Sequence, residues 1–344
     1  MAEEDIRSEI SQLGKYRLIS HLMGHDEKNN PPAHVIDDAM VTDTGGQLTV
    51  TAQKLFVENV HFDLTYFPLK HLGFKCATIV FTDVLAMNAL PRELSLCLAV
   101  SNRFSIEALD EFMAGVRACC HYNEVELTGL DVTSSVAGLT VGMTATGAVE
   151  PDRLVRRSGA RENELICATG DFGAAYAGLL LLQREKQIFE ATHNSHPDFD
   201  GYEYLLERQL KPEPRLDIIR KLRELDVVPT AMTAVSEGLA TSLFHLCEPD
   251  TLGCTIYEGK IPLAQLTFDT LRQLKIVATT VALNGGEDYE LLFTIRQDDY
   301  EKVKTEHEIA VIGYIGEKNG GRNLISNDNK QIELKAQGFI EQEK

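Results

Sequence analysis

The sequence predicts a mixed α/β protein of two domains, and three observations carry this prediction. The chain has 344 residues, more than a single hydrophobic core usually holds. Strand-like runs alternate with amphipathic helical stretches along its whole length. A polar passage with a proline, EPDRLVRRSGARENE, interrupts them near the middle and is the best candidate for a boundary. We therefore expect one α/β domain over residues 1–150 and a second over residues 151–344.

The first half should form strands and two helices. QLTVTAQKLFVENVHF has β-type runs of Leu, Val, Thr and Phe and predicts two strand segments around a bend. HLGFKCATIVFTDVLAMNALPREL predicts a helix that ends near an acidic turn, while ELSLCLAVS and GLTVGMTATGAV predict strands. In SIEALDEFMAGVRACCHYN, apolar residues recur every three or four positions behind Ser105, which predicts an amphipathic helix that begins there.

The second half continues the alternation. LICATGDFGAAYAGLLLLQRE predicts a strand, a glycine turn and a helix, and EPRLDIIRKLREL is an amphipathic helix. The polar residues 185–212 predict an excursion of helix and loop. TAMTAVSEGLATSLFHL predicts a short strand, a tight turn at residues 236–238 and a helix, so the turn is either a ligand site or an ordinary helix start. GCTIYEGKIPL, VATTVALNGGEDYELLFTI and AVIGYIGE are three further strand-like units.

Charge and composition exclude several classes of protein. With 33 Lys+Arg against 52 Asp+Glu the net charge is −19, so the chain repels polyanions and we expect no nucleic-acid partner. The acidic N-terminus lacks the pattern of a signal peptide, and no apolar run is long enough to span a membrane. The seven cysteines form no C-x-x-C pair, which favours buried thiols in a cytoplasmic protein over disulfides or a zinc site.

Acidic residues at predicted strand ends and turns suggest a cation site. Asp37 and Asp38 form a pair in VIDDAMV, Asp83 follows ATIVFT, and Asp131 follows LTGL. Mg²⁺ takes oxygen ligands and often combines one or two carboxylates with substrate phosphates. Each aspartate alone is more often a turn residue or a helix cap, so only their convergence would make a site.

Three other segments offer ligand contacts, each with a plain structural alternative. In NGGEDYELLFTI the glycines allow close approach to Glu287 or Asp288, although the segment could equally be a turn into a buried strand. In RRSGA, Arg156 or Arg157 could bind a phosphate, or the loop could simply be solvated. His61 falls in a predicted strand, where a lone histidine is more often structural. TGDFGAA is a weak nucleotide motif because it matches neither common phosphate-loop pattern.

Taken in order, these segments resemble the thiamine-monophosphate kinase family, which is related to aminoimidazole ribonucleotide synthetase. DDAMV, VENVHFD, FTDVLAMNALPR, GLDVTSS and RRSGARENELICATGDFGAAYAGL are similar to family motifs, and GGEDYELLFT is identical to one. The resemblance implies the two-domain aminoimidazole ribonucleotide synthetase-like fold, with a homodimer formed through the N-terminal sheet. It also implies a site between the domains for ATP, Mg²⁺ and thiamine monophosphate, where the γ-phosphoryl group is transferred to yield thiamine diphosphate.

The resemblance also assigns roles to individual residues. The expected metal ligands are Asp37, Asp83, Asp131 and Glu237. The expected ATP contacts are Gly129, Asp131, Arg157 and Ser236. The expected substrate contacts are His61, Glu287 and Phe339, the last standing where the family usually has a tryptophan.

Several departures from the family pattern concern the metal site. Lys54 replaces one metal-binding aspartate and Ala234 another, while Glu237 replaces a third and keeps its charge. Ile36 and Leu130 replace glycines.

Two functions follow from the resemblance and these departures. In the first, Lys54 supplies a fixed cation in place of one metal, and the chain is a kinase with reduced activity or with a related phosphate compound as substrate. In the second, it is a non-catalytic relative that binds a nucleotide, a phosphate ligand or a partner without phosphoryl transfer.

Overall fold

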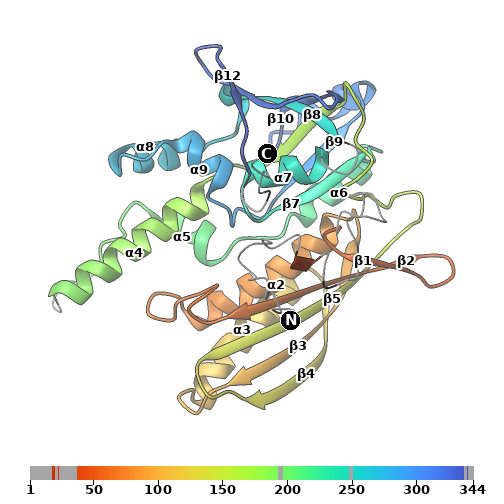
Figure 1. Cartoon of the computed structure of the whole chain (residues 1–344). Helices are drawn as coiled ribbons and strands as arrows, with labels where there is room; N and C mark the ends of the chain where they lie inside the picture. Colours follow the sequence, from red (N-terminus) through yellow and green to blue (C-terminus); the bar gives the residue numbers. More distant parts are fainter. Residues whose placement is uncertain are drawn as a thin grey trace, which may run out of the picture.

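The computed structural model describes residues 37–192, 197–247 and 251–336, together with residues 18, 19, 22 and 339. Within these residues the chain forms a five-stranded sheet, with strand order β1-β2-β5-β3-β4, and a seven-stranded sheet, with order β12-β11-β8-β10-β6-β9-β7. The five-stranded sheet lies below and the seven-stranded sheet above in Figure 1. No helix among the described residues is long and apolar enough to cross a membrane.

The five-stranded sheet is covered on one face by two helices. Its strands are β1 (Met40–Asp43), β2 (Leu48–Val57), β3 (Leu90–Val100), β4 (Glu126–Ser134) and β5 (Leu139–Val149). The helices are α2 (Leu69–Leu85) and α3 (Ile106–Tyr122). Ser105 caps α3 as predicted, because its Oγ accepts a hydrogen bond of 3.2 Å from the N–H of Ala108. Helix α2 is buried along most of its length because it lies between this sheet and the second half of the chain (Figure 1).

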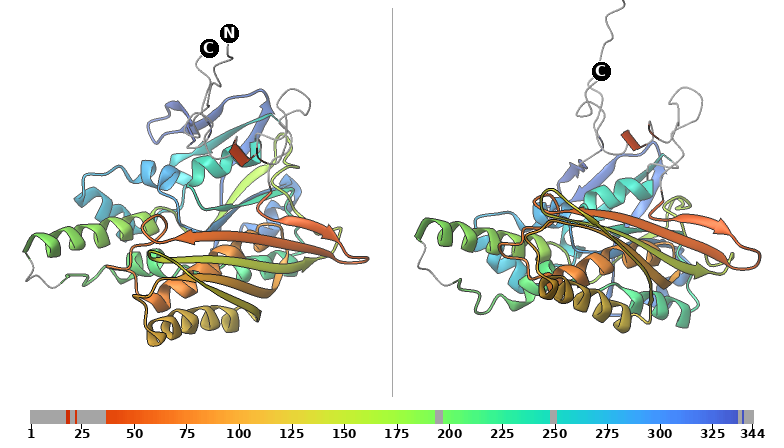
Figure 2. Two further views of the ribbon diagram at one scale, coloured as in Figure 1. Left: turned by 60° about the horizontal axis from the view of Figure 1, so that its bottom comes forward. Right: turned by 90° about the horizontal axis from the view of Figure 1, so that it is seen from below.

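The seven-stranded sheet carries the remaining helices. Its strands are β6 (Leu165–Thr169), β7 (Ala231–Val235), β8 (Leu252–Tyr257), β9 (Glu290–Ile295), β10 (Ile309–Lys318), β11 (Arg322–Ile325) and β12 (Gln331–Glu333). The helices are α4 (Ala174–Thr192), α5 (Glu203–Leu210), α6 (Leu216–Glu224), α7 (Leu239–Cys247), α8 (Gln265–Gln273), α9 (Ala278–Asn284) and α10 (Tyr300–Val303). Helix α4 projects away from both sheets (Figure 2). The short helical turns η2 (Glu258–Lys260) and η3 (Gln297–Asp299) complete the described elements.

Several sequence-based expectations about local structure are wrong. VATTVALN was taken as part of a strand-like unit, but residues 278–284 form α9, because Ala278, Val281 and Ala282 bury one helical face. QLTVTAQKLFVENVHF is expected to form two strand segments around a bend, with His61 in a strand, but one continuous strand, β2, ends at Val57 and His61 lies in the turn that follows. Asp83 and Asp131 are expected at strand ends or turns, but Asp83 lies in the last turn of α2 and Asp131 lies inside β4.

The two halves share buried side chains. Tyr289, which precedes β9, packs into the hydrophobic core of the five-stranded sheet. Leu85 and Ala86, at the end of α2, pack in turn with residues of α6, β7 and β9. The hydroxyl of Thr78 in α2 also donates a hydrogen bond of 2.9 Å to the carbonyl of Pro212. Side chains on this contact between the halves therefore have fixed positions.

Candidate functional site

Three aspartates gather between the halves, and each is paired with a basic side chain. We call Asp37, Asp38 and Asp83 the acidic cluster, and their partners Lys54, Arg156 and Arg157 the fixed cations. Asp38 accepts two hydrogen bonds from the Arg157 guanidinium, from Nε at 2.9 Å and from Nη2 at 2.8 Å. Asp37 accepts the backbone N–H of Arg157 at 3.1 Å and pairs with the Arg156 side chain.

The third pair joins β2 to α2. Lys54 Nζ lies 2.7 Å from Asp83 Oδ2, and the Asp83 side chain is only 6% exposed. Lys54 faces α2 because it alternates with the buried Ala52 and Phe56 on the helix-covered face of β2. Burial raises the pKa of Asp83 to about 6, although Lys54 opposes this shift. Burial by itself would lower the pKa of Lys54, but the carboxylate of Asp83 more than reverses this, so the pair is ionised at neutral pH.

The donor set around the acidic cluster does not match a metal centre. Ala234, in β7, has no ligand atom, and its backbone N–H instead donates to Asp38 at 3.4 Å. The hydroxyl of Thr233 contacts both Asp38 and Arg157. No group of three or more His, Cys, Asp or Glu side chains in the described part of the chain is arranged to hold a metal ion.

Asp131 is not part of this cluster in the single chain. Lys54 pairs with Met143, Met143 with Leu96, and Leu96 with Leu130, so these four residues share the helix-covered face of the sheet. Asp131, next to Leu130, therefore lies on the opposite face, three strands away from Lys54. Gly129 lies on the same face as Asp131, because it pairs with Ser95 and Asp131 with Cys97.

The turn between β7 and α7 contains Ser236, Glu237 and Gly238 and contacts the GGEDY segment. The carbonyl of Ser236 accepts the N–H of Glu287 at 2.8 Å, and Val235 accepts the N–H of Tyr289 at 2.9 Å. Gly238 has a φ of +96°, and a Cβ there would lie 2.5 Å from the carbonyl oxygen of Leu283. The turn is thus fixed by backbone contacts, and Glu237 stands within it.

His61 and Glu287, both predicted to contact substrate, do come together. They line one cavity of about 370 Å³ with Tyr66, Phe67 and Tyr176. Glu287 accepts hydrogen bonds of 2.9 Å from Lys75 and from Gln209. Burial would raise the pKa of Glu287, but Lys75 and Gln209 reverse this and hold it below its ordinary value.

Lys75 is a buried ammonium group beneath this cavity. It is 3% exposed, donates to the carbonyl of Gln209 at 2.6 Å, and lies 5.4 Å from the ring centre of Phe67 and 5.9 Å from that of Tyr289. It therefore fixes the position of Glu287 rather than lining the cavity. Sequence reasoning missed Lys75, because nothing in the helical pattern of α2 marks one buried lysine as a partner for a residue in the other half.

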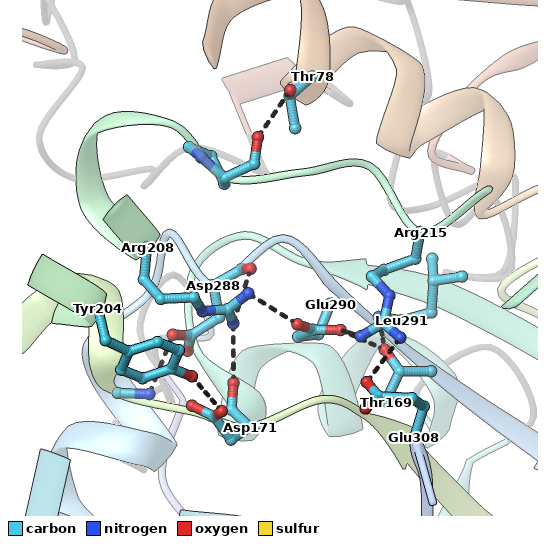
Figure 3. A network of polar contacts seen from close by, with 12 residues as sticks. Thr78, Thr169, Asp171, Tyr204, Arg208, Arg215, Asp288, Glu290, Leu291 and Glu308 are labelled. Atoms are coloured by element: carbon cyan, nitrogen blue, oxygen red, sulfur yellow. Dashed lines mark hydrogen bonds and ion pairs between the residues drawn. The ribbon is translucent and has the colours of Figure 1, made fainter. Parts of the chain in front are cut away.

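The remaining acids of GGEDYELLFT belong to a buried polar network (Figure 3). Glu290 lies between two arginines, with Arg215 Nη1 at 2.7 Å and Arg208 Nη1 at 2.9 Å. Asp288 was a candidate ligand contact in the sequence, but it is buried and accepts the N–H of Gly173 at 3.0 Å. Sequence reasoning missed both arginines; the only signal was an acidic residue at the start of a buried strand, which requires a partner.

Phe339 and the two replaced glycine positions lie elsewhere. The ring centre of Phe339 is 5.2 Å from those of Phe244 and His245 in α7, and Phe339 does not line the His61–Glu287 cavity. Leu130 is 53% exposed on β4, and Ile36 lies outside the described residues.

Comparison with known proteins identifies relatives over nearly the whole chain. Residues 36–149 match the family model "AIR synthase related protein, N-terminal domain". The thiamine-monophosphate kinase of Bacillus subtilis is 28% identical over 88% of this chain and 91% of its own, and that of Aquifex aeolicus is 26% identical over 95% and 98%. Among solved structures, the complex of AaThiL with AMPPCP and TMP has a TM-score of 0.82 and 25% identity, covering 98% of this chain and all of that one. The thiamine-monophosphate kinase of Stenotrophomonas maltophilia has a TM-score of 0.70 and 25% identity, covering 92% and 97%.

Proposed function

Because the chain belongs to the aminoimidazole ribonucleotide synthetase-like superfamily, we propose that it acts as a thiamine-monophosphate kinase. It would bind ATP and thiamine monophosphate and transfer the γ-phosphoryl group to the substrate phosphate, which yields thiamine diphosphate. The observation that carries this proposal is that His61 and Glu287 line one cavity while the acidic cluster and Arg157 lie along the same contact between the halves. Helix α2 carries Lys75 at the first site and Asp83 at the second, eight residues or about 12 Å apart along its axis.

The cavity suits a cationic heterocycle such as the thiazolium of thiamine. Glu287 supplies a carboxylate that its partners keep ionised, and Tyr66, Phe67 and Tyr176 supply aromatic surface that attracts a cation. At the acidic cluster, the fixed cations Lys54, Arg156 and Arg157 present N–H donors of the kind that bind phosphate oxygens. Phosphoryl transfer needs little beyond such positioning and charge stabilisation.

Mg²⁺ and the remaining site assignments stay predictions. The donor set does not fit the ion at Asp83, because Lys54 occupies the carboxylate and Ala234 offers no oxygen, so no step here is assigned to Mg²⁺. Gly129 and Asp131 lie on the face of the five-stranded sheet opposite Lys54. They would contact ATP only if the nucleotide also reached that face, for example in a dimer formed through it. Ser236 and Glu237, in the β7–α7 turn, stay candidate ATP and cation contacts, and Phe339 a candidate substrate contact.

We further propose a cytoplasmic homodimer with domains over residues 1–150 and 151–344. The dimer would form through the face of the five-stranded sheet opposite α2 and α3, where Gln53, Leu55 and Cys97 are exposed in the described structure. All seven cysteines are free thiols, and the other six are buried, which fits a reducing compartment. A monomer in sedimentation velocity at micromolar concentration would contradict the dimer.

A second candidate function is binding without phosphoryl transfer, which the Lys54–Asp83 pair and Ala234 favour. The deciding measurement is thiamine diphosphate formation from thiamine monophosphate and ATP, with and without Mg²⁺. For a kinase we expect product, and a loss in kcat/KM for Asp83→Asn, because Lys54 would lose the carboxylate that fixes its position. Asp110→Asn, on the exposed side of α3, is the control and should leave the rate unchanged.

Binding is measured in parallel as the ATP-dependent shift in melting temperature. A shift without product supports a nucleotide-binding relative. A result with neither product nor shift contradicts both the kinase and the nucleotide-binding relative.

A further inference from the structure

We propose that the acidic cluster binds no divalent cation and that the fixed cations take its place. Lys54, Arg156 and Arg157 would then meet nucleotide phosphates directly, where the family resemblance predicts bridging metal ions. The proposal about the metal does not require the chain to be a kinase. The proposal about phosphates rests on the nucleotide binding proposed above.

Charge balance is the first reason. The three carboxylates of the acidic cluster carry three negative charges, and the three fixed cations carry three positive charges, so the six side chains sum to zero. An ordinary divalent-cation site is negative before the ion arrives, and that charge is what attracts the ion. Here the chain itself has supplied the compensating charge.

Geometry is the second reason. Mg²⁺ requires near-octahedral oxygen ligands at about 2.0–2.1 Å. Lys54 Nζ already lies 2.7 Å from Asp83 Oδ2, and the Arg157 guanidinium occupies both oxygens of Asp38, whose side chain is 3% exposed. An ion could reach these oxygens only if the basic groups moved away, which would leave two positive charges beside it.

The third reason is that β7 offers no ligand in place of the aspartate that Ala234 replaces. Ala234 donates its backbone N–H to Asp38 while its carbonyl accepts the hydroxyl of Ser242, and the hydroxyl of Thr233 is engaged by Arg157. Asp131 lies across the sheet from Lys54. Even if Lys54 withdrew, an incoming ion would therefore lack the two carboxylates that the family pattern places at positions 54 and 234.

Two of the fixed cations, Lys54 and Arg156, are accessible to a ligand, whereas the Arg157 side chain is only 13% exposed. The side chains of Lys54 and Arg156 are 34% and 44% exposed, whereas their carboxylate partners are 6% and 13% exposed. A phosphate approaching from solvent would thus meet N–H donors before it met carboxylates.

Mn²⁺ binding to the full chain, followed by electron paramagnetic resonance, tests the metal proposal directly. We expect Asp83→Asn to leave Mn²⁺ binding unchanged, because the unaltered protein binds no Mn²⁺ at Asp83. The double variant Lys54→Asp with Ala234→Asp should bind Mn²⁺ at least about tenfold more tightly, because it restores two carboxylate ligands and removes one positive charge. A charge-matched control, Lys70→Asp with Ala191→Asp, makes the same change in net charge at exposed positions and should not.

Two results would overturn the metal proposal. One is stoichiometric Mn²⁺ binding by the unaltered protein that disappears in Asp83→Asn. The other is a double variant that folds, as judged by circular dichroism, and binds Mn²⁺ no better than the charge-matched control.

The phosphate proposal is tested by the rise in melting temperature that ATP causes in EDTA and in MgCl₂. We expect equal shifts in both, and a shift reduced in Lys54→Met. A shift that appears only with Mg²⁺ would overturn the direct role of the fixed cations. If ATP causes no shift in either buffer, the proposed nucleotide binding fails, while the Mn²⁺ result still decides the metal proposal.

Discussion

Replacing Glu290 with glutamine should strongly destabilise the fold. Glu290 is 1% exposed and takes hydrogen bonds from Arg208, Arg215 and the hydroxyl of Thr169 (Figure 3). Its carboxylate is the common partner of both guanidinium groups, which are themselves 15% and 10% exposed. Glutamine keeps the shape but is neutral, and its amide group would face an N–H donor of one arginine.

The expected loss follows from removing one partner of a buried charge network. Breaking a buried pair in this way typically costs about 3–5 kcal/mol. Arg215 keeps Asp217 and Glu308 as partners, so the buried charge that loses its ion pair is that of Arg208. Glu308 provides a matched control, because its carboxylate lies 2.9 Å from Nη2 of the same Arg215 but is 63% exposed. Glu308→Gln should therefore cost less than about 1 kcal/mol.

Urea denaturation provides the free energies of unfolding. The chain has no tryptophan and ten tyrosines, so tyrosine fluorescence can be followed beside circular dichroism. Coincident transitions by the two probes are required before free energies are compared. If Glu290→Gln and Glu308→Gln differ by less than about 1 kcal/mol, burial is not what makes the Glu290 network important, and the reasoning fails.

Three further predictions concern other residues of the site. Burial raises the pKa of Asp288 to about 7, so the folded chain binds this proton more tightly than the unfolded chain, and stability should fall by up to about 4 kcal/mol as pH rises from about 4 through 7. Asp288→Asn should flatten that decline in urea unfolding at pH 5 and pH 8; an unchanged slope would contradict it. Gly238→Ala should lower the free energy of unfolding by about 1–3 kcal/mol, since a Cβ there meets the Leu283 carbonyl at 2.5 Å. Gly45→Ala is the control: its φ is +86°, no atom lies within 4 Å of its Cβ, and it should cost less in the same urea unfolding experiment. Lys75→Met should raise the pKa of Glu287 and weaken thiamine monophosphate binding about tenfold near pH 5 in calorimetry, and equal affinity would show that Lys75 does not position Glu287.

The sequence predicted most of the architecture because those signals are local. The spacing of apolar residues behind Ser105 located α3 and its cap, and the apolar run after GGEDY located β9, whose six residues are all buried. VATTVALN misled because a short apolar run suits either a buried strand or a buried helix. Only its packing against α7 decides which one forms.

The site was predicted less completely because its pairs join distant parts of the chain. The sequence indicates that Lys54 replaces an aspartate that binds metal in the family. Only the three-dimensional structure identifies Asp83 as its ion-pair partner. The Lys75–Glu287 contact likewise joins the two halves, and the Arg215–Glu290 contact joins residues 75 positions apart within the second half. Asp131 shows the converse: its residue type suggested a ligand, and the strand register placed it on the other face of the sheet.

The identity of GGEDYELLFT to the family motif says less about catalysis than about folding. Glu287 pairs with Lys75 at the cavity, Asp288 binds the Gly173 backbone, Tyr289 enters the N-terminal core, and Glu290 joins Arg208 to Arg215. The Glu287 and Tyr289 contacts join the two halves, and the Asp288 and Glu290 contacts join elements within the second half. A chain that had lost phosphoryl transfer would therefore still need the motif. The residues that distinguish a kinase from a binding relative are instead Lys54 and Ala234, which take no part in these contacts of the motif. Restoring aspartate at these two positions should therefore change metal binding while leaving the fold intact, and a collapse of the fold would show that the Lys54–Asp83 pair had become structural.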